Sequence, residues 1–158
     1  MMFEVSTNGD DDGDPAPLTL YLVKRLELVI RALMDDALRP RGLTTLQYTA
    51  LTVLRNRGAL SSAQLARRSF LRPQTMHEMV TTLEKRGLIA RHSLESNKRI
   101  LLATLTDAGR ELLDDCAPVV QELENALMNG LGHRAAFRED LRQGISALAA
   151  LAEERRTD

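Results

Sequence analysis

Residues 61–106 read SSAQLARRSFLRPQTMHEMVTTLEKRGLIARHSLESNKRILLATLT, and this stretch decides the fold. Ser61 with Gln64 is a capping-box pattern, in which each side chain satisfies a free backbone N–H of the other residue, so it predicts the start of a short helix. Pro73 marks the first turn of a second helix, where its missing N–H costs nothing, and Gly87 ends that helix. Two helices joined by a tight turn are typical of a helix-turn-helix.

The residues after Gly87 no longer follow a helical period. Two strand-like runs, 88–91 and 100–105, are joined by a polar loop from His92 to Arg99. Two short strands around a charged loop, following a helix-turn-helix, predict a wing. The expected fold class is therefore mainly α with a small β-wing: a winged helix-turn-helix flanked by further helices.

Two helices are predicted before this stretch. Apolar residues recur with helical spacing over 18–38, and the run from Arg39 to Gly42 ends that pattern. Thr44 with Gln47 is another capping box and opens a second helix that stops at Gly58.

Two more helices are predicted after the wing. Thr106 caps a long helix that continues to about residue 129, and Pro118 predicts a kink or a division of it near Ala117. A last helix is expected over about 134–154, where apolar residues again form one stripe.

The formal net charge is −1, but the charge is unevenly distributed along the chain. Residues 61–105 hold 8 basic and 3 acidic side chains, whereas residues 1–17 and 106–158 each carry a net charge of −5. A basic middle between acidic ends fits a polyanionic partner for the middle alone. An ordinary solvated surface can show the same pattern, so charge alone leaves both interpretations open.

The compartment follows from three simple features. A lone cysteine, Cys116, excludes an internal disulfide and fits a reducing cytoplasm. The first 17 residues are acidic and lack the apolar core of a signal peptide. No run approaches the roughly 18 apolar residues that a membrane span needs. We therefore expect a cytoplasmic protein with no membrane partner.

The helix that begins at Pro73 has two distinct faces. Its apolar residues fall at helical spacing and predict a buried stripe of Met76, Met79, Val80 and Leu83. Most side chains on the outward face are short or hydrogen-bonding groups that can contact base edges in the DNA major groove. They are Gln74, Thr75, His77, Glu78, Thr81 and Lys85. An ordinary solvated face is the alternative for each of them.

Three basic residues are candidates for contacts with DNA phosphates. Arg72 occupies the expected N-cap of this helix, where Asp, Ser or Asn is usual and the helix dipole disfavours a cation. A nearby phosphate would reverse that penalty, although a solvated Arg is also possible. Lys98 and Arg99 lie at the far end of the wing loop, from which two adjacent basic side chains can reach the minor groove or its phosphates.

The sequence shows no convincing catalytic set. An enzyme would need a nucleophile with its base, or a carboxylate pair, and neither is found. His77, His92 and His133 are far apart in sequence and do not form a metal-binding pattern with Cys116. We therefore expect no enzymatic activity, no metal and no cofactor.

These residues resemble the multiple antibiotic resistance regulator (MarR) family of bacterial winged-helix repressors. The similarity extends from about Leu18 to Glu154. It is strongest in RPQTMHEMVTTLEKRGLIAR (72–91), similar to the family's recognition helix, and in NKRILLATLT (97–106), similar to its wing signature. Within that signature, the matching residues are Arg99, Leu105 and Thr106.

Three residues depart from the family pattern. Asn97 stands where the family has an Asp that pairs with the wing Arg, so it can keep a hydrogen bond but not the ion pair and is the candidate wing-shaping residue. Arg72 replaces the usual N-cap Asp, and Glu78 replaces a residue that is often basic. The resemblance therefore implies retained DNA binding with an unusual operator preference.

The resemblance also implies partners. It implies a homodimer whose first helix and last two helices intertwine, which would place two recognition helices on a pseudo-palindromic operator of double-stranded DNA. It further implies a small, often phenolic or anionic, ligand bound between the dimer helices and the DNA-binding lobe. Candidate ligand contacts are Leu26, Ile30, Tyr48 and Leu112, with Arg110 for an anion, although each has an alternative as a core or surface residue.

The expected organisation has four segments: a flexible acidic tail (1–17), an N-terminal dimerisation helix (18–43), the winged helix-turn-helix DNA-binding lobe (44–106) and C-terminal dimerisation helices (107–158). The expected function is a dimeric DNA-binding transcriptional regulator of the MarR type, a repressor released by a small ligand. Two alternatives remain open. One is a winged-helix protein-interaction module without DNA binding, and the other is an oxidant-sensing repressor that uses Cys116.

Overall fold

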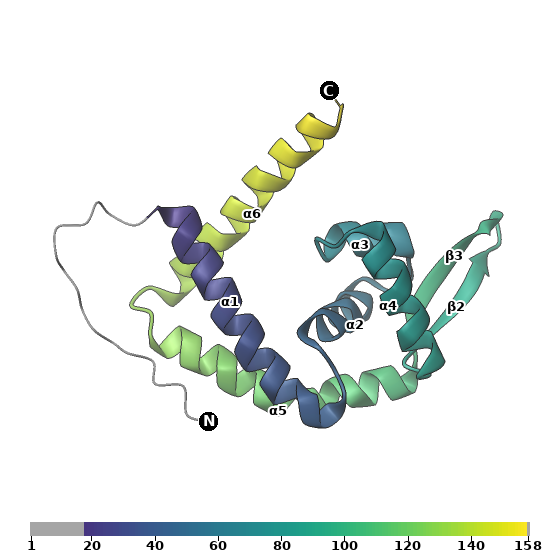
Figure 1. Cartoon of the computed structure of the whole chain (residues 1–158), viewed down its shortest axis with the longest axis horizontal. Coiled ribbons are helices and arrows are strands. Elements are labelled where there is room, and N and C mark those ends of the chain that lie inside the picture. Colours follow the sequence, from purple (N-terminus) through teal and green to yellow (C-terminus); the bar gives the residue numbers. More distant parts are fainter. Residues whose placement is uncertain (1–17, 158) are drawn as a thin grey trace.

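The computed structural model describes residues 18–157 and is mainly helical with a small sheet, as predicted (Figure 1). The expected acidic tail, 1–17, lies outside the described residues. In chain order the elements are α1 (Thr19–Leu38), the 3-10 turn η1 (Arg39–Arg41), α2 (Thr45–Arg57), β1 (Leu60–Ser61), α3 (Ser62–Arg68), α4 (Pro73–Lys85), β2 (Ile89–Leu94), β3 (Asn97–Leu105), α5 (Asp107–Asn129) and α6 (Arg134–Thr157).

Both predicted capping boxes are confirmed. The Thr44 hydroxyl accepts a hydrogen bond from the Gln47 N–H at 3.2 Å, and the Gln47 side chain accepts one from the Thr44 N–H at 3.1 Å. Ser61 and Gln64 make the same reciprocal pair at 3.2 and 2.9 Å. These bonds fix the starts of α2 and α3 by local chemistry alone.

The sheet contains one strand more than the sequence indicated. It is a three-stranded antiparallel sheet in the order β1-β3-β2. Strand β1 is only two residues long and pairs Leu60 with Ala103 and Ser61 with Leu102. A strand of two residues has no periodicity of its own, so only its distant partner reveals it.

The wing differs from the expected loop over 92–99. Strand β2 continues to Leu94 and β3 already begins at Asn97, so the strands are longer and the turn between them is short. The register is regular from Ile89 opposite Leu105 to Ser93 opposite Leu101, and then shifts so that Leu94 faces Asn97. The three residues 98–100 therefore have no partner in β2 and form a bulge-like irregularity of the strand, called the bulge below; such irregularities re-aim side chains.

The predicted division of the long helix at Pro118 is wrong. Helix α5 continues through Pro118 from Asp107 to Asn129. A proline inside a helix weakens the hydrogen bonding of carbonyl groups in the preceding turn. The carbonyl that loses its N–H partner at Pro118 is that of Asp114, and Arg41 Nε donates to the next carbonyl, that of Asp115, at 2.8 Å.

The core fills the winged lobe and the part of α5 that crosses it. Its fully buried side chains come from the end of α1, from α2, α3, α4 and β2, and from α5; the largest are Leu38, Leu51, Leu54, Leu65, Met76, Leu83, Ile89 and Leu113. Apolar burial of this kind provides most of the stability of a small domain. The base of the wing and both helices of the helix-turn-helix are therefore held on one shared core.

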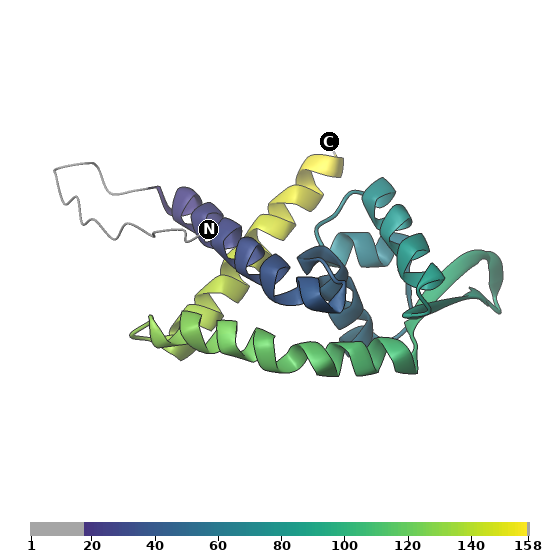
Figure 2. The ribbon, with the colours of Figure 1, turned by 60° about the horizontal axis from the view of Figure 1, so that its bottom comes forward.

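Helix α5 links the two ends of the molecule. In Figure 2 it runs along the base, with the wing beside its first residues and α1 and α6 near its other end. Helix α6 then leads away at an angle, and its ribbon crosses that of α1 in the view of Figure 1.

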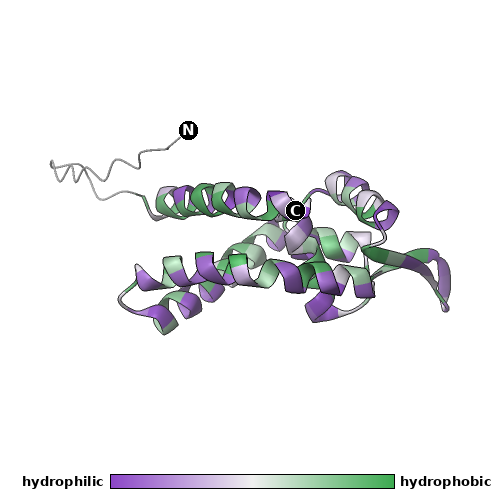
Figure 3. Ribbon diagram, turned by 90° about the horizontal axis from the view of Figure 1, so that it is seen from below, coloured by the Kyte–Doolittle hydropathy of each residue, from purple (hydrophilic) through white to green (hydrophobic). Residues whose placement is uncertain are grey.

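Much of the apolar surface outside the lobe is exposed. Figure 3 shows long hydrophobic stretches on α1, in contrast to the hydrophilic tip of the wing. Large exposed apolar side chains include Leu20, Leu22, Val29 and Leu33 on α1 and Ile145, Leu148 and Leu151 on α6. None of the helices within residues 18–157 combines the length and apolar character needed to span a membrane.

Candidate nucleic-acid interface

Helix α4 presents the face that the sequence predicted. Arg72 is its N-cap with no side-chain capping bond, and Pro73 follows in the first turn. The predicted buried stripe is confirmed, since Met76, Val80 and Leu83 are 0% exposed and Met79 is 9% exposed. The stripe orients α4 so that its opposite face points away from the core.

The outward face of α4 carries a small hydrogen-bonded group. Gln74 Nε2 donates to Glu78 Oε1 at 3.0 Å, one helical turn along. The Thr81 hydroxyl donates to the His77 carbonyl at 3.0 Å and is half-buried, whereas Gln74, His77 and Glu78 are exposed. The Glu78 bond uses one amide N–H of Gln74 and restricts its rotamer, so the two side chains form one polar unit on this face. Thr75 and Lys85 are exposed on the same helix.

The wing bulge is closed by Asn97. Its Oδ1 accepts a hydrogen bond from the backbone N–H of Arg99 at 3.1 Å. The amide therefore holds the backbone of the bulge and does not restrain the Arg99 guanidinium. Lys98 and Arg99, both exposed, lie in the bulged segment.

On α3, the turn after it, α4 and the wing, six basic side chains are exposed and have no acceptor among the described residues: Arg67, Arg68, Arg72, Lys85, Lys98 and Arg99. In α1, α5 and α6, by contrast, most bases pair with a nearby acid, as Arg31 does with Glu27 and Arg138 with Glu124. Sequence analysis did not place Arg67 and Arg68 in the site. Their position in the last turn of α3, just before the tight turn, was the available signal.

Three contacts fix the C-terminal end of α4. Arg91 on β2 donates from both Nε and a terminal nitrogen to one carboxylate oxygen of Glu84, the Nε bond being 2.9 Å. Arg86 donates to the Gly42 carbonyl at 2.7 Å, and the Thr106 hydroxyl donates to the Gly87 carbonyl at 2.7 Å. Helix α4 is thus tied to the wing, to the turn after α1 and to the start of α5, and none of these ties was predicted.

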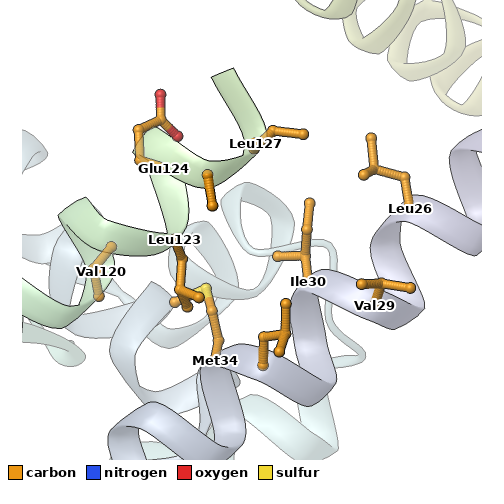
Figure 4. Close-up of a pocket in the computed structure, with 10 residues that line it drawn as sticks. Leu26, Val29, Ile30, Met34, Val120, Leu123, Glu124 and Leu127 are labelled. Atoms are coloured by element: carbon orange, nitrogen blue, oxygen red, sulfur yellow. The ribbon is translucent and has the colours of Figure 1, made fainter. Parts of the chain in front are cut away.

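A pocket of about 220 Å³ lies between α1 and α5, away from the winged lobe (Figure 4). Two of the five candidate ligand residues, Leu26 and Ile30, line it, together with Met34, Leu123 and Leu127 among others. Almost all of the lining is apolar.

The other candidate ligand residues lie elsewhere. Tyr48 and Leu112 pack against the core of the lobe, and neither lines the pocket. Arg110 pairs with Asp107 at 3.1 Å on the surface of α5, so it does not supply a cation to the pocket. The five residues are not one site, because helical spacing shows which residues face inward but not which distant faces meet.

Cys116 is buried, with 0% of its surface exposed. Burial raises the pKa of the thiol; the positive charge of Arg41 acts in the opposite direction and Asp115 adds to the increase. The thiolate is the form that oxidants attack, so these surroundings disfavour reaction at Cys116.

The profile of the MarR family matches residues 43–101, which include the helix-turn-helix and most of the wing. The HTH-type transcriptional repressor Rv2887 of Mycobacterium tuberculosis is 41% identical over 108 residues, covering 68% of this chain and 77% of that protein. The chain belongs to the MarR family. As a member it is a DNA-binding transcriptional regulator, in agreement with the exposed polar face of α4 and the unpaired basic side chains around it.

Solved MarR-type structures share the architecture. The crystal structure of the Mycobacterium tuberculosis MarR family protein Rv2887 gives a TM-score of 0.61 at 34% identity, covering 83% of this chain and 95% of that one. The crystal structure of CouR from Rhodococcus jostii RHA1, bound to p-coumaroyl-CoA, gives a TM-score of 0.72 at 25% identity, covering 82% of this chain and 90% of that one. The similarity includes the long helices as well as the winged lobe.

Proposed function

We propose that the protein is a dimeric repressor in which α4 enters the major groove of a pseudo-palindromic operator while the wing contacts the adjacent backbone. The observation that carries this proposal is the group of six free bases on the lobe. Most Lys and Arg side chains of the long helices form ion pairs with Asp or Glu. The lobe is therefore the surface with unpaired positive charges that can bind another molecule. Phosphates are the groups that such a surface binds in DNA.

Arg72 provides the most specific electrostatic argument. Its guanidinium lies at the N-terminal end of α4, where the helix dipole is positive and no side chain caps the free N–H groups. A phosphate at this position would accept from those N–H groups and from Arg72 together. Arg67 and Arg68, one tight turn earlier, extend the same positive edge.

The polar face of α4 is proposed to select the sequence. The amide oxygen of Gln74 and its second N–H are available to a base, while Glu78 can accept from the amino group of cytosine. Exposed Thr75 and His77 flank this unit, with Thr81 and Lys85 further along the helix. Because Glu78 repels phosphate, its place on this face favours contact with a base edge over contact with the backbone.

Dimerisation is proposed through α1, α5 and α6. The exposed apolar residues of α1 and α6 lie outside α4 and the wing in the chain, so a second copy can cover them and leave the polar face of α4 free. A monomer would expose these side chains to water at a cost of about 25 cal/mol for each Å² of apolar surface.

We also propose that a small ligand releases the operator. CouR, whose crystal structure holds p-coumaroyl-CoA, shares this fold. The pocket between α1 and α5 offers an apolar wall suited to an aromatic ring, and its ionisable lining residue, Glu124, already pairs with Arg138 at 2.8 Å. A carboxylate among the lining residues favours a phenolic ligand over a free anion at this place.

The test is binding of the full chain to DNA from its own promoter region over a series of salt concentrations. Log affinity should fall linearly with log salt, with a slope of about −0.9 for each neutralised phosphate. Arg99→Ala should weaken binding to every operator variant and make the slope shallower by about 1. Gln74→Ala should instead change the order of preference among variants. No binding at low salt would refute the proposal and favour a protein-interaction module.

A further inference from the structure

The wing is connected to α4 by a short segment. Helix α4 ends at Lys85 and β2 begins at Ile89, with Gly87 between them at a φ of 70°, where residues other than glycine are strained. Leu88 and Ile89 anchor the base of the wing in the core. Beyond this base, the apolar residues Ile100 and Leu101 of β3 are exposed, so apolar packing does not fix the direction of the outer wing.

The ion pair of Glu84 and Arg91 lies where this apolar packing ends. Arg91 is two residues after buried Ile89 and therefore on the same face of β2, opposite buried Ala103. Its Nε and terminal nitrogen both donate to the Glu84 carboxylate in the last turn of α4. Within residues 18–157, no other ion pair or side-chain hydrogen bond joins α4 to the wing.

The pair is less exposed than most ion pairs of the chain. The side chain of Arg91 is 21% exposed and that of Glu84 is 36% exposed. The hydrogen bond from Arg91 lowers the pKa of the Glu84 carboxyl, and the same bond raises the pKa of Arg91. Both groups therefore remain charged around neutral pH, and two donors on one acceptor restrict the guanidinium plane.

We propose that Glu84 and Arg91 are positioning residues, which set the angle between α4 and the wing so that both reach the same duplex. The inference rests on the proposed DNA contacts of Lys98 and Arg99. Because these two basic side chains lie beyond Arg91 along the hairpin, a change in the angle at the ion pair displaces them from the DNA backbone.

For Glu84→Gln, the positioning role predicts a change in DNA affinity opposite in sign to the change expected from the altered charge alone. Glu84→Gln removes a negative charge close to DNA, so without a positioning role it would strengthen binding or leave it unchanged. With that role, the affinity for the operator falls about tenfold, as the loss of a close coupled pair predicts. The matched control is Glu95→Gln, which removes an exposed acid from the wing turn that has no partner among the described residues and should not weaken binding.

A double-mutant cycle shows whether the loss is transmitted through the wing. In a background of Lys98→Ala with Arg99→Ala, the effect of Glu84→Gln should shrink to about twofold or less. Hydroxyl-radical footprints should show that Glu84→Gln exposes the same nucleotides as the wing substitutions, while those protected by α4 stay protected. Thermal melting of each variant separates these effects from loss of folding, which would lower binding equally in both backgrounds.

The outcomes are distinguishable. If the wild type binds no DNA, the proposed function fails and this inference fails with it. If the wild type binds and Glu84→Gln binds equally or more tightly, only the positioning role is overturned. A tenfold loss that persists without Lys98 and Arg99 would also overturn it, because the pair would then act on α4 and not on the wing.

Discussion

Asp35 joins two helices through a single oxygen atom. Its Oδ1 accepts hydrogen bonds from the hydroxyl and from the backbone N–H of Thr45, each at 2.7 Å. Thr45 is the first residue of α2, so an acid on α1 supplies an acceptor to the next helix. The Thr45 hydroxyl and then its N–H lower the pKa of the Asp35 carboxyl.

We expect Asp35→Asn to lower the free energy of unfolding at pH 7 by about 1 to 2 kcal/mol, because an amide is a weaker acceptor than a carboxylate. The folded-state pKa is depressed, so this stabilisation is complete above the unfolded pKa of about 3.9 and is lost as pH falls through the lower folded value. Urea unfolding at pH 7 and in acid measures both effects. The control is Asp36→Asn, which breaks an exposed pair with Arg39 and should cost less than about 0.5 kcal/mol. An equal loss of unfolding free energy in the two variants would contradict a stabilising role for the Asp35–Thr45 hydrogen bonds.

At the scale of elements, the start of α5 packs closely against the chain between α4 and the wing. A Cβ added to Gly109 would collide with the Leu88 carbonyl oxygen and would lie 2.7 Å from Leu105 Cδ1. Backbone cannot move aside as a flexible side chain can. The first turn of α5 therefore lies directly on the chain that connects α4 to the wing.

Gly109→Ala should lower the free energy of unfolding by about 2 kcal/mol or more, because overpacking in a rigid site forces the backbone to shift. Gly144→Ala is the matched control, since nothing lies within 4 Å of the added methyl group in α6. It should raise stability by about 0.5 to 1 kcal/mol through helix propensity. Chemical denaturation measures the change in unfolding free energy of both variants. An unchanged value for Gly109→Ala would contradict the prediction, because the backbone around the added methyl group would then have moved at no cost.

The same elements show what the sequence could and could not predict. Helix starts at Thr44, Ser61 and Pro73 were predictable because a cap depends on residues within one turn. The bulge at 98–100 and strand β1 were not, because each exists only through a partner distant in sequence. At Pro118 the local sequence predicted a break, but α5 continues through it from Asp107 to Asn129. In the site, helical period oriented the face of α4, whereas the ion pair of α4 with the wing needed the packed structure.

For the whole molecule, the apolar surface of α6 leads to a prediction about assembly. Leu148 is 57% exposed and Ile145 is 54% exposed, one turn apart. In a twofold dimer each substitution occurs twice, so Leu148→Glu should weaken self-association by at least about 100-fold through two unpaired buried carboxylates. Sedimentation measures this, with Ser146→Glu, an exposed neighbour, as the control. A stable dimer of Leu148→Glu would place the interface elsewhere.

The unbroken α5 also has a mechanical consequence. From Leu127, beside the pocket, to Asp107, beside the wing, it is a lever about 30 Å long, because a helix rises about 1.5 Å per residue. A tilt of roughly 5° about the pocket end moves the other end by about 3 Å, close to the 3.4 Å rise between base pairs. A helix divided at Pro118 would absorb such a tilt at the joint. An unbroken helix transmits more of it to the wing, where a displacement of one base-pair step would be enough to put the proposed phosphate contacts out of register.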